Sequence, residues 1–511
     1  MVWRVRRYFD VRAGEGRRVL FSFLYVAVVA ASFLLARPIR NALFLKQYGA
    51  YALVYVYAAV PVVLSLFVPI YTRVAARVGS RTMAVATLVF FSSNVVLFWY
   101  AFRFHAGAMA VRGSMAWYLP AAFYVWVNCF GVIAPVQAWS FANLLFDTRQ
   151  ARRLFGLIAV GASLGSIGAG LLARVLVRPI GGAVNMLLVL AGLILTAAVI
   201  VAVAHMQIHV GGSGRRARAP KHPLGDTLRR ITGSTYLRFM AAMVFLAAIT
   251  TQWITFQLNL VASQRIADAD ALVRFFATFN FALGAVSFVL QLALVGPALR
   301  RFGLGVTILV LPVALATGSF TMVLLPAALW TVLLTSSLDQ GLRFSLDKAT
   351  YELLYLPLPP AQRGQIKATI DIVVSRVADA VAAVLLGLAT EGFLVFHGLR
   401  FGVRGTAALN LCFLVSWIAI ATRLRGEYVR TIQSSIHRHR IASEHAPDVP
   451  LDRSAASMLA EKLVSNDPAD VRYALDSSKL RSLGWRPEVD FDTGLPILCA
   501  GIRRMKTGGA R

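Results

Sequence analysis

The chain has 511 residues, of which 58% are hydrophobic and 15% charged, with a mean hydropathy of +0.67. Soluble globular domains are nearer half apolar and a quarter charged, so this composition excludes an ordinary soluble enzyme or secreted scaffold and indicates a membrane protein. Lys and Arg outnumber Asp and Glu by 52 to 23, a net charge of +29. In so apolar a chain we interpret this excess as basic loops facing the cytoplasm and anionic membrane lipid, not as a nucleic-acid-binding surface.

Apolar stretches long enough to cross a bilayer recur along the chain. The first follows a basic segment, as in a signal peptide, but more spans come after it, so we interpret it as a transmembrane helix. The sequence predicts an all-α membrane protein of about twelve transmembrane helices in two six-helix lobes. The candidates lie near 19–36, 51–72, 82–104, 117–141, 156–176, 183–205, 235–261, 271–296, 304–325, 326–346, 366–390 and 406–422.

Loop charges predict the orientation of these spans. With a cytoplasmic N-terminus, the segments expected inside carry about twice as many Lys and Arg residues as those expected outside, as the positive-inside rule requires. The stretch between spans six and seven contains GGSGRRARAPKHP and has no apolar periodicity, which is typical of a flexible linker. We expect an N-terminal lobe at 1–205, a basic cytoplasmic linker at 206–234, a C-terminal lobe at 235–426 and a polar cytoplasmic tail at 427–511. Two such lobes allow a central site to open alternately to either side.

Motifs for ATP hydrolysis or for a cofactor are missing from the sequence. No G-x-x-x-x-G-K-[ST] run occurs, and the glycine-rich stretch GASLGSIGAG lacks the lysine and lies within an apolar span. Gly161 and Gly165 instead form a G-x-x-x-G face suited to close helix packing. The three cysteines are far apart and show no metal-ligand or disulfide spacing. We therefore expect a secondary transporter that is not an enzyme and has no cofactor.

Polar residues inside the spans are candidate ligand contacts, because each is costly to insert into a membrane. Arg37 and Arg40 lie one helical turn apart at the exit of the first span, where they would suit an anion or would extend to the outer headgroups. Asn128 and Gln137 interrupt the fourth span and Gln257 the seventh. Such amides either tie helices together or contact the substrate.

The densest group of charges lies between Asp339 and Asp379. Two oppositely charged pairs are spaced four residues apart, Asp339 with Arg343 and Lys367 with Asp371, so each pair can close on one helix face. In the eleventh span, Asp371, Ser375 and Asp379 form a polar stripe at intervals of four residues. The cation beside this stripe is Arg376. The group is either an ion-paired structural clasp or a site that handles substrate or protons.

Four long blocks of the sequence resemble the bacterial ATP:ADP antiporter family over about residues 5–435. The resemblance implies a twelve-helix, major-facilitator-like carrier in the bacterial inner membrane that exchanges nucleotides by alternating access, with cationic side chains receiving the phosphates. The blocks are FDVRAGEGRR, LLARPIRNALF, WSFANLLFDTRQARRLFGLIAVGASLGSIGAG and LDKATYELLYLPLPPAQRGQIKATID.

The resemblance also aligns individual residues with those of the established exchangers. Arg40 lies where they have a lysine, and Asn128 where they have a glutamate. Lys367 and Asp371 match a K-A-x-I-D run of the family, whereas Asp379 stands where the exchangers have a lysine. We expect a nucleotide or other phosphorylated organic anion to bind near these residues.

Two other functions are open alternatives. Asp371 and Asp379 would suit a proton-coupled carrier of another small organic anion, and a non-transporting membrane module would use its tail to dock a soluble partner. Within that tail, 454–477 could form two short amphipathic helices. Residues 472–495 resemble the C-terminal end of dTDP-glucose 4,6-dehydratases, but no strand–G-x-G-x-x-G–helix unit accompanies them to bind NAD.

Overall fold

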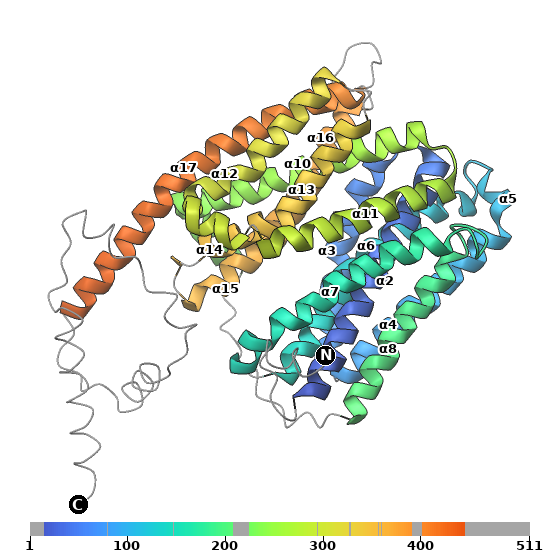
Figure 1. Cartoon of the computed structure of the whole chain (residues 1–511), viewed down its shortest axis with the longest axis horizontal. Helices are drawn as coiled ribbons and strands as arrows, with labels where there is room; N and C mark the ends of the chain where they lie inside the picture. Colours follow the sequence, from blue (N-terminus) through green and yellow to red (C-terminus); the bar gives the residue numbers. More distant parts are fainter. Residues whose placement is uncertain are drawn as a thin grey trace, which may run out of the picture. The chain divides into compact units, whose positions relative to one another are not determined.

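The computed structural model describes residues 15–444, except positions 79, 147, 208–223, 294, 326–328, 356, 359 and 391–400. All regular structure in these ranges is helical (Figure 1). The first half contains α2 (Gly16–Tyr48), α3 (Leu53–Arg77), α4 (Ser80–Phe104), α5 (Ala106–Met109), the 3-10 helix η1 (Met115–Tyr118), α6 (Leu119–Leu145), α7 (Thr148–Leu176) and α8 (Met186–Gln207).

The second half is also made only of helices in its described part. It contains α9 (Leu224–Gly233), α10 (Thr235–Arg265), α11 (Ala269–Ala293), α12 (Val295–Leu324), α13 (Leu329–Leu342), the π-helix η2 (Arg343–Asp347), α14 (Lys348–Leu354), α15 (Pro360–Ala368), the π-helix η3 (Thr369–Val374), α16 (Ser375–Thr390) and α17 (Val403–Glu444).

Eleven helices of the described residues are long and apolar enough to cross a membrane, which confirms the all-α membrane architecture. The remaining predicted span, 326–346, corresponds to α13, whose α-helical part has only 14 residues before the π-helix begins. The prediction that the first span ends near residue 36 is wrong, because α2 continues to Tyr48. Its last turns bury Ala42, Phe44 and Leu45, so packing extends the helix beyond the apolar run.

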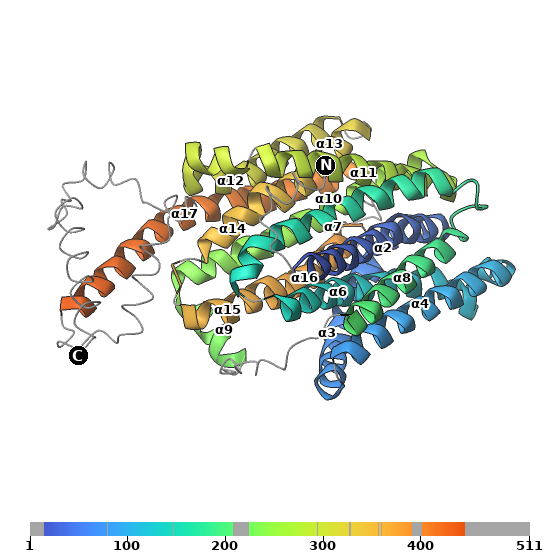
Figure 2. The ribbon, with the colours of Figure 1, turned by 60° about the horizontal axis from the view of Figure 1, so that its bottom comes forward.

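Glycines set the close approach of α7 to its neighbours. An added Cβ at Gly161 would lie 2.8 Å from the backbone oxygen of Phe23 in α2, and one at Gly170 would lie 2.9 Å from the backbone oxygen of Ala277 in α11. Only residues without a side chain permit these distances. Helix α7 therefore packs directly on α2 and on α11, beside which it runs in both views (Figures 1 and 2).

The expected linker and tail differ from the structure at their edges. Residues 224–233 of the expected linker form α9, an amphipathic helix that buries Thr227 and Ile231, so the expectation of a flexible segment is wrong there. The boundary expected at 426/427 falls inside α17. The described residues before 434 belong to one compact unit. The two short tail helices and the dehydratase-like segment lie outside the described residues.

Candidate functional site

A cavity of 660 Å³ lies between the two halves of the chain. From the first half, α3 and α6 contribute Tyr57, Tyr124 and Asn128 to its wall. From the second half come parts of α10, η2, α14, η3 and α16, which supply most of its charged groups. Its volume falls in the range of about 300–1,000 Å³ that is usual for small-molecule sites. The wall is therefore aromatic on one side and charged on the other.

Both π-helical segments of the described chain border this cavity. η2 places Arg343 and Asp347 on the wall, and η3 places Asp371 there. A π-helix is rare and is found mostly at functional sites, because its wider turn redirects side chains that an α-helix would align. The two irregular segments thus aim charged groups of spans ten and eleven into the same space.

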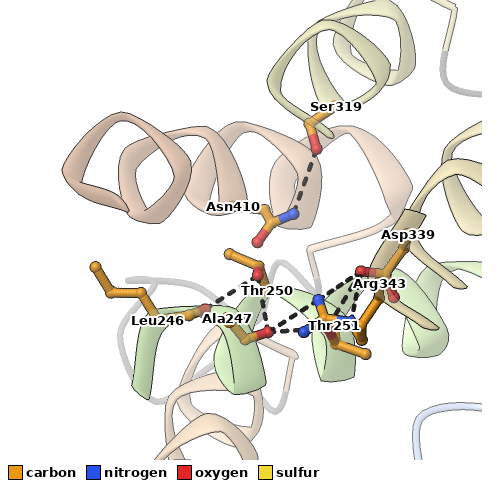
Figure 3. A network of polar contacts seen from close by, with 8 residues as sticks. All are labelled: Leu246, Ala247, Thr250, Thr251, Ser319, Asp339, Arg343 and Asn410. Carbon is orange, nitrogen blue, oxygen red and sulfur yellow. Dashed lines mark hydrogen bonds and ion pairs between the residues drawn. The ribbon is translucent and has the colours of Figure 1, made fainter. Parts of the chain in front are cut away.

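Arg343 is held in place by two oxygen atoms, one from Asp339 and one from Ala247 (Figure 3). Its Nη2 lies 2.6 Å from Oδ1 of Asp339, which is 2% exposed, and 3.4 Å from the carbonyl oxygen of Ala247 on α10. Oγ1 of Thr251 donates to the same Asp339 oxygen at 3.3 Å. The predicted pairing of Asp339 with Arg343 is confirmed, and it leaves the guanidinium fixed at the cavity wall.

The charges on the cavity wall cancel formally. Three cations, Arg343, Lys348 and Arg376, face three carboxylates, which are Asp347, Asp371 and Asp379. Nη1 of Arg376 lies 3.0 Å from Oδ2 of Asp379, so this pair is already closed. Asp371 accepts a hydrogen bond of 2.8 Å from the Tyr355 hydroxyl. An anion that enters here meets three cations that already have carboxylate partners: Asp379 on the wall for Arg376, and Asp339 and Glu352 behind the wall for Arg343 and Lys348.

Lys367 does not pair with Asp371, contrary to the prediction. Its Nζ donates to Glu352 Oε1 at 2.6 Å, and Lys348 lies 3.4 Å from the same oxygen. Partial burial would raise the pKa of the Glu352 carboxyl, but the hydrogen bond and charge of Lys367, aided by Lys348, outweigh it and hold that pKa below its ordinary value. This cluster joins α14 to α15 beside the cavity.

Arg37 and Arg40 lie within α2, not at its end, and neither is on the cavity wall. Arg40 is 7% exposed, and its guanidinium carbon lies 4.1 Å from the centroid of the Tyr124 ring. Its Nε also donates to Oδ1 of Asn41 at 3.1 Å. Arg37 lies 5.8 Å from the ring of Phe33. Arg40 therefore reaches the cavity only through the aromatic ring that it supports.

The three predicted amides occupy different environments. Asn128 lines the cavity and donates to the carbonyl oxygen of Tyr124 at 2.9 Å. Gln137 donates to the hydroxyl of Tyr71 at 2.6 Å, and Gln257 donates to Thr406 at 3.3 Å, both away from the cavity wall. Gln137 and Gln257 thus tie helices together, which was the alternative interpretation of such amides.

Comparison with known proteins assigns the chain to a family. Residues 2–428 match the TLC ATP/ADP transporter family. The chain belongs to this family. ADP,ATP carrier protein 1 of Chlamydia pneumoniae is 25% identical over 365 residues, 63% of this chain and 70% of that protein. ADP,ATP carrier protein 1 of Chlamydia muridarum is 26% identical over 60% of this chain, which spans 64% of that relative.

Solved structures show which fold this TLC family member adopts. A bacterial homologue of the human lysosomal transporter Spinster gives a TM-score of 0.53 at 13% identity, with 83% of this chain and 99% of that one covered. A bacterial homologue of the iron transporter ferroportin gives 0.54 at 13% identity, with 80% and 98% covered. These likenesses confirm the major-facilitator-like fold. The TLC protein is a multi-pass membrane transporter, and not an enzyme.

Several cavity residues of this TLC transporter were missed by the analysis of the sequence. Tyr57, Tyr124 and Tyr351 line the cavity, but in an apolar span a tyrosine gives no signal that separates it from packing or interfacial aromatics. Asp347 is 6% exposed and faces the cavity from the π-helix. Its place next to Lys348 in the family-like LDKATYELL block was the available signal, and it was not used.

Proposed function

We propose that this chain exchanges an adenine nucleotide, or a closely related phosphorylated anion, across the bacterial inner membrane by alternating access through the cavity between its halves. The observation that carries the proposal is the division of the cavity wall into an aromatic side and a charged side that contains three cations. Its support comes from membership of an ATP/ADP transporter family and from the three cations on the cavity wall. We place both termini in the cytoplasm, as the loop charges predict.

The aromatic side suits the base of a nucleotide. The rings of Tyr57 and Tyr124 lie side by side at 6.3 Å between centroids, and both line the cavity. Arg40 lies against the Tyr124 ring and fixes its orientation. Stacking on aromatic rings is worth about 1–3 kcal/mol per base and tolerates different bases. We therefore assign the base to α3 and α6.

The cationic side suits the phosphates. Arg343 and Arg376 present planar guanidinium groups that bind phosphate oxygens in pairs, and Lys348 adds a point charge. Asp379 neutralises Arg376 at 3.0 Å. A phosphate that replaces this carboxylate keeps Arg376 paired, and Asp379 then needs a new partner or a proton. Asp347 and Asp371 stay on the wall as further counter-charges.

Because the two ends of the nucleotide contact different halves of the chain, the bound molecule joins them. Such bridging gives the closed, occupied state contacts that the empty state lacks, which is the condition for a ligand to shift a conformational equilibrium. We place the remaining predicted cations, Arg37 and Lys367, outside the direct contacts. They add positive potential near the cavity and hold neighbouring helices.

The test is uptake of labelled ATP by purified protein in liposomes, with and without internal ADP. We expect rapid uptake only into ADP-loaded vesicles. Arg376→Gln removes one charge-assisted contact and raises the half-saturating ATP concentration about 10- to 100-fold. Arg73→Gln, which changes an exposed arginine of α3 outside the cavity wall, is the matched control and leaves uptake unchanged.

Two results would contradict the proposal. Equal uptake into empty vesicles would exclude obligatory exchange, and equal half-saturation for R376Q and R73Q would exclude this cavity as the phosphate site. A second candidate function is proton-coupled uptake of another small organic anion, favoured by the three carboxylates on the wall. It predicts uptake that follows a pH gradient without any internal substrate.

A further inference from the structure

A second cavity, of 510 Å³, lies between α7, α11 and α13 and shares no lining residue with the first. Arg174 enters from the last turn of α7, and Arg274 from the second turn of α11. The rest of the wall is apolar apart from one hydroxyl, and it comprises Ala271, Phe275, Thr278, Phe279, Ala282 and Leu333. The cavity therefore has two cations at one end of an apolar crevice.

Neither arginine is neutralised within the described part of the chain. Arg174 is exposed and forms no ion pair there, and Arg274 is half-buried with its Nε enclosed and without a hydrogen-bond partner. A buried donor that lacks a partner costs free energy, which an acceptor supplied from outside would recover. No carboxylate belongs to the wall of this cavity. An anion would supply both the missing acceptor and the missing counter-charge.

The surroundings of the crevice are suited to hydrocarbon. Leu171 and Val175 flank Arg174 on α7 and are 51% and 57% exposed, and Trp330 and Leu334 flank Leu333 on α13 at 55% and 50%. In a chain that crosses a membrane, such side chains face lipid. They mark the crevice as open to the bilayer and not to the central cavity.

The length of the crevice matches one leaflet. Ala271 lies near the start of α11 and Ala282 is eleven residues further along, a rise of roughly 16 Å in an α-helix. That is about half of the 30 Å hydrocarbon core of a bilayer. The arginines are at the helix ends, where headgroup phosphates lie, and Phe279, Ala282 and Leu333 are at the depth of acyl chains.

We propose that this crevice binds one anionic phospholipid, with its phosphate held by Arg174 and Arg274 and an acyl chain along Phe275 and Phe279. Arg174 comes from the first half of the chain and Arg274 from the second. The lipid therefore bridges the halves where Gly170 already packs against Phe281. Two guanidinium groups beside an apolar crevice suit the phosphate and the acyl chains of an anionic phospholipid. The proposal does not depend on which anion is transported.

The experiment measures the first lipid that binds to the delipidated, full-length protein in detergent by native mass spectrometry. Dioleoylphosphatidylglycerol is compared with dioleoylphosphatidylcholine, which has the same chains and no net charge. We expect a preference for phosphatidylglycerol that falls about fivefold in R174Q and about 25-fold in R174Q/R274Q, as for about 1 kcal/mol per arginine near an anionic surface. Arg178→Gln, at an exposed arginine just beyond α7 and off the crevice wall, keeps the full preference.

Two outcomes would overturn the proposal. If R174Q and R178Q retain the same preference as the unaltered protein, the crevice is not the lipid site. If glycerol 3-phosphate displaces the lipid at equal concentration, the site recognises a soluble anion without acyl chains. Because Arg174 is exposed, R174Q does not disturb the packed helices, so it decides the question even where the double variant fails to fold.

Discussion

The glycines of α7 allow a paired test of how closely this helix packs. A Cβ at Gly165 would lie 2.8 Å from the backbone carbon of Ala27 on α2 and closer still to its oxygen, whereas a Cβ at Gly168 would meet nothing within 4 Å. Carbon atoms in contact are separated by about 3.5–4.0 Å, so Gly165→Ala forces α7 away from α2 by roughly 0.7 Å or more. Gly168→Ala requires no movement.

The two substitutions differ in free energy for the same reason. Both replace Gly by Ala inside a helix, which by itself favours the helix by about 1 kcal/mol. At Gly165 the added methyl group also overpacks the interface, at a cost of about 1–3 kcal/mol, and it meets backbone that has no rotamer by which to move aside. We expect Gly168→Ala to raise the unfolding temperature slightly and Gly165→Ala to lower it.

Thermal unfolding in detergent, followed by tryptophan fluorescence, measures this difference under identical conditions for both variants. Transport activity serves as the second measurement, because a displaced α7 also shifts the glycine contact at Gly170 with α11. If Gly165→Ala and Gly168→Ala have the same unfolding temperature, α7 and α2 are not as close as the structure shows. The packing argument would then be wrong.

Three further predictions concern the site. Asp339→Asn removes the carboxylate that lies 2.6 Å from the Arg343 guanidinium. We expect the free energy of unfolding to fall by about 3 kcal/mol, which is measured as a lower unfolding temperature. An unchanged unfolding temperature would contradict this prediction. Lys367 and Lys348 depress the pKa of Glu352. The contribution of this cluster to folding stability is therefore complete above the ordinary glutamate pKa, and it is lost as the pH falls through the lowered pKa of the folded protein. The difference in unfolding free energy between the unaltered protein and Glu352→Gln should therefore disappear on acidification. It is at most about 1 kcal/mol, because the side chains of Lys367 and Glu352 are 33% and 45% exposed. A difference that does not change with pH would refute this prediction. Tyr124→Ala should raise the half-saturating ATP concentration about 5- to 100-fold, because it removes a stacking surface for the base. Tyr124→Phe keeps this surface and should not raise that concentration. Neither substitution should change inhibition by inorganic triphosphate, which has no base.

The transmembrane helices could be predicted from the sequence because the signal for each helix lies within its own stretch of residues. A run of about 20 apolar residues must satisfy its own backbone hydrogen bonds, so it forms a helix almost regardless of its neighbours. The exact ends depend on partners, as α2 shows. The apolar run stops at Ala36, but Phe44 packs on Tyr124 with 5.3 Å between ring centroids, and this distant contact extends the helix.

The site was predictable only where its contacts are local. Asp339 and Arg343 lie on one helix four residues apart, and their pair was found from spacing alone. The same rule failed for Lys367 and Asp371, because each has another partner: Lys367 donates to Glu352, and Asp371 accepts from the Tyr355 hydroxyl. The true partner of Lys367 is Glu352, fifteen residues away on another helix, which no helical periodicity indicates.

The cancelling charges of the main cavity also bear on why exchange would be obligatory. Closure of the cavity removes water from three cations and three carboxylates, and desolvated charges are tolerated only when each is paired. Arg343 and Arg376 have carboxylate partners in the structure, but Asp347 has no hydrogen-bond or ion-pair partner among the described residues. A phosphate that takes Arg376 frees Asp379 as well, so the occupied wall must rearrange its acids before it can close. On the proposed function, the carboxylates as well as the cations would therefore decide which anions complete the cycle.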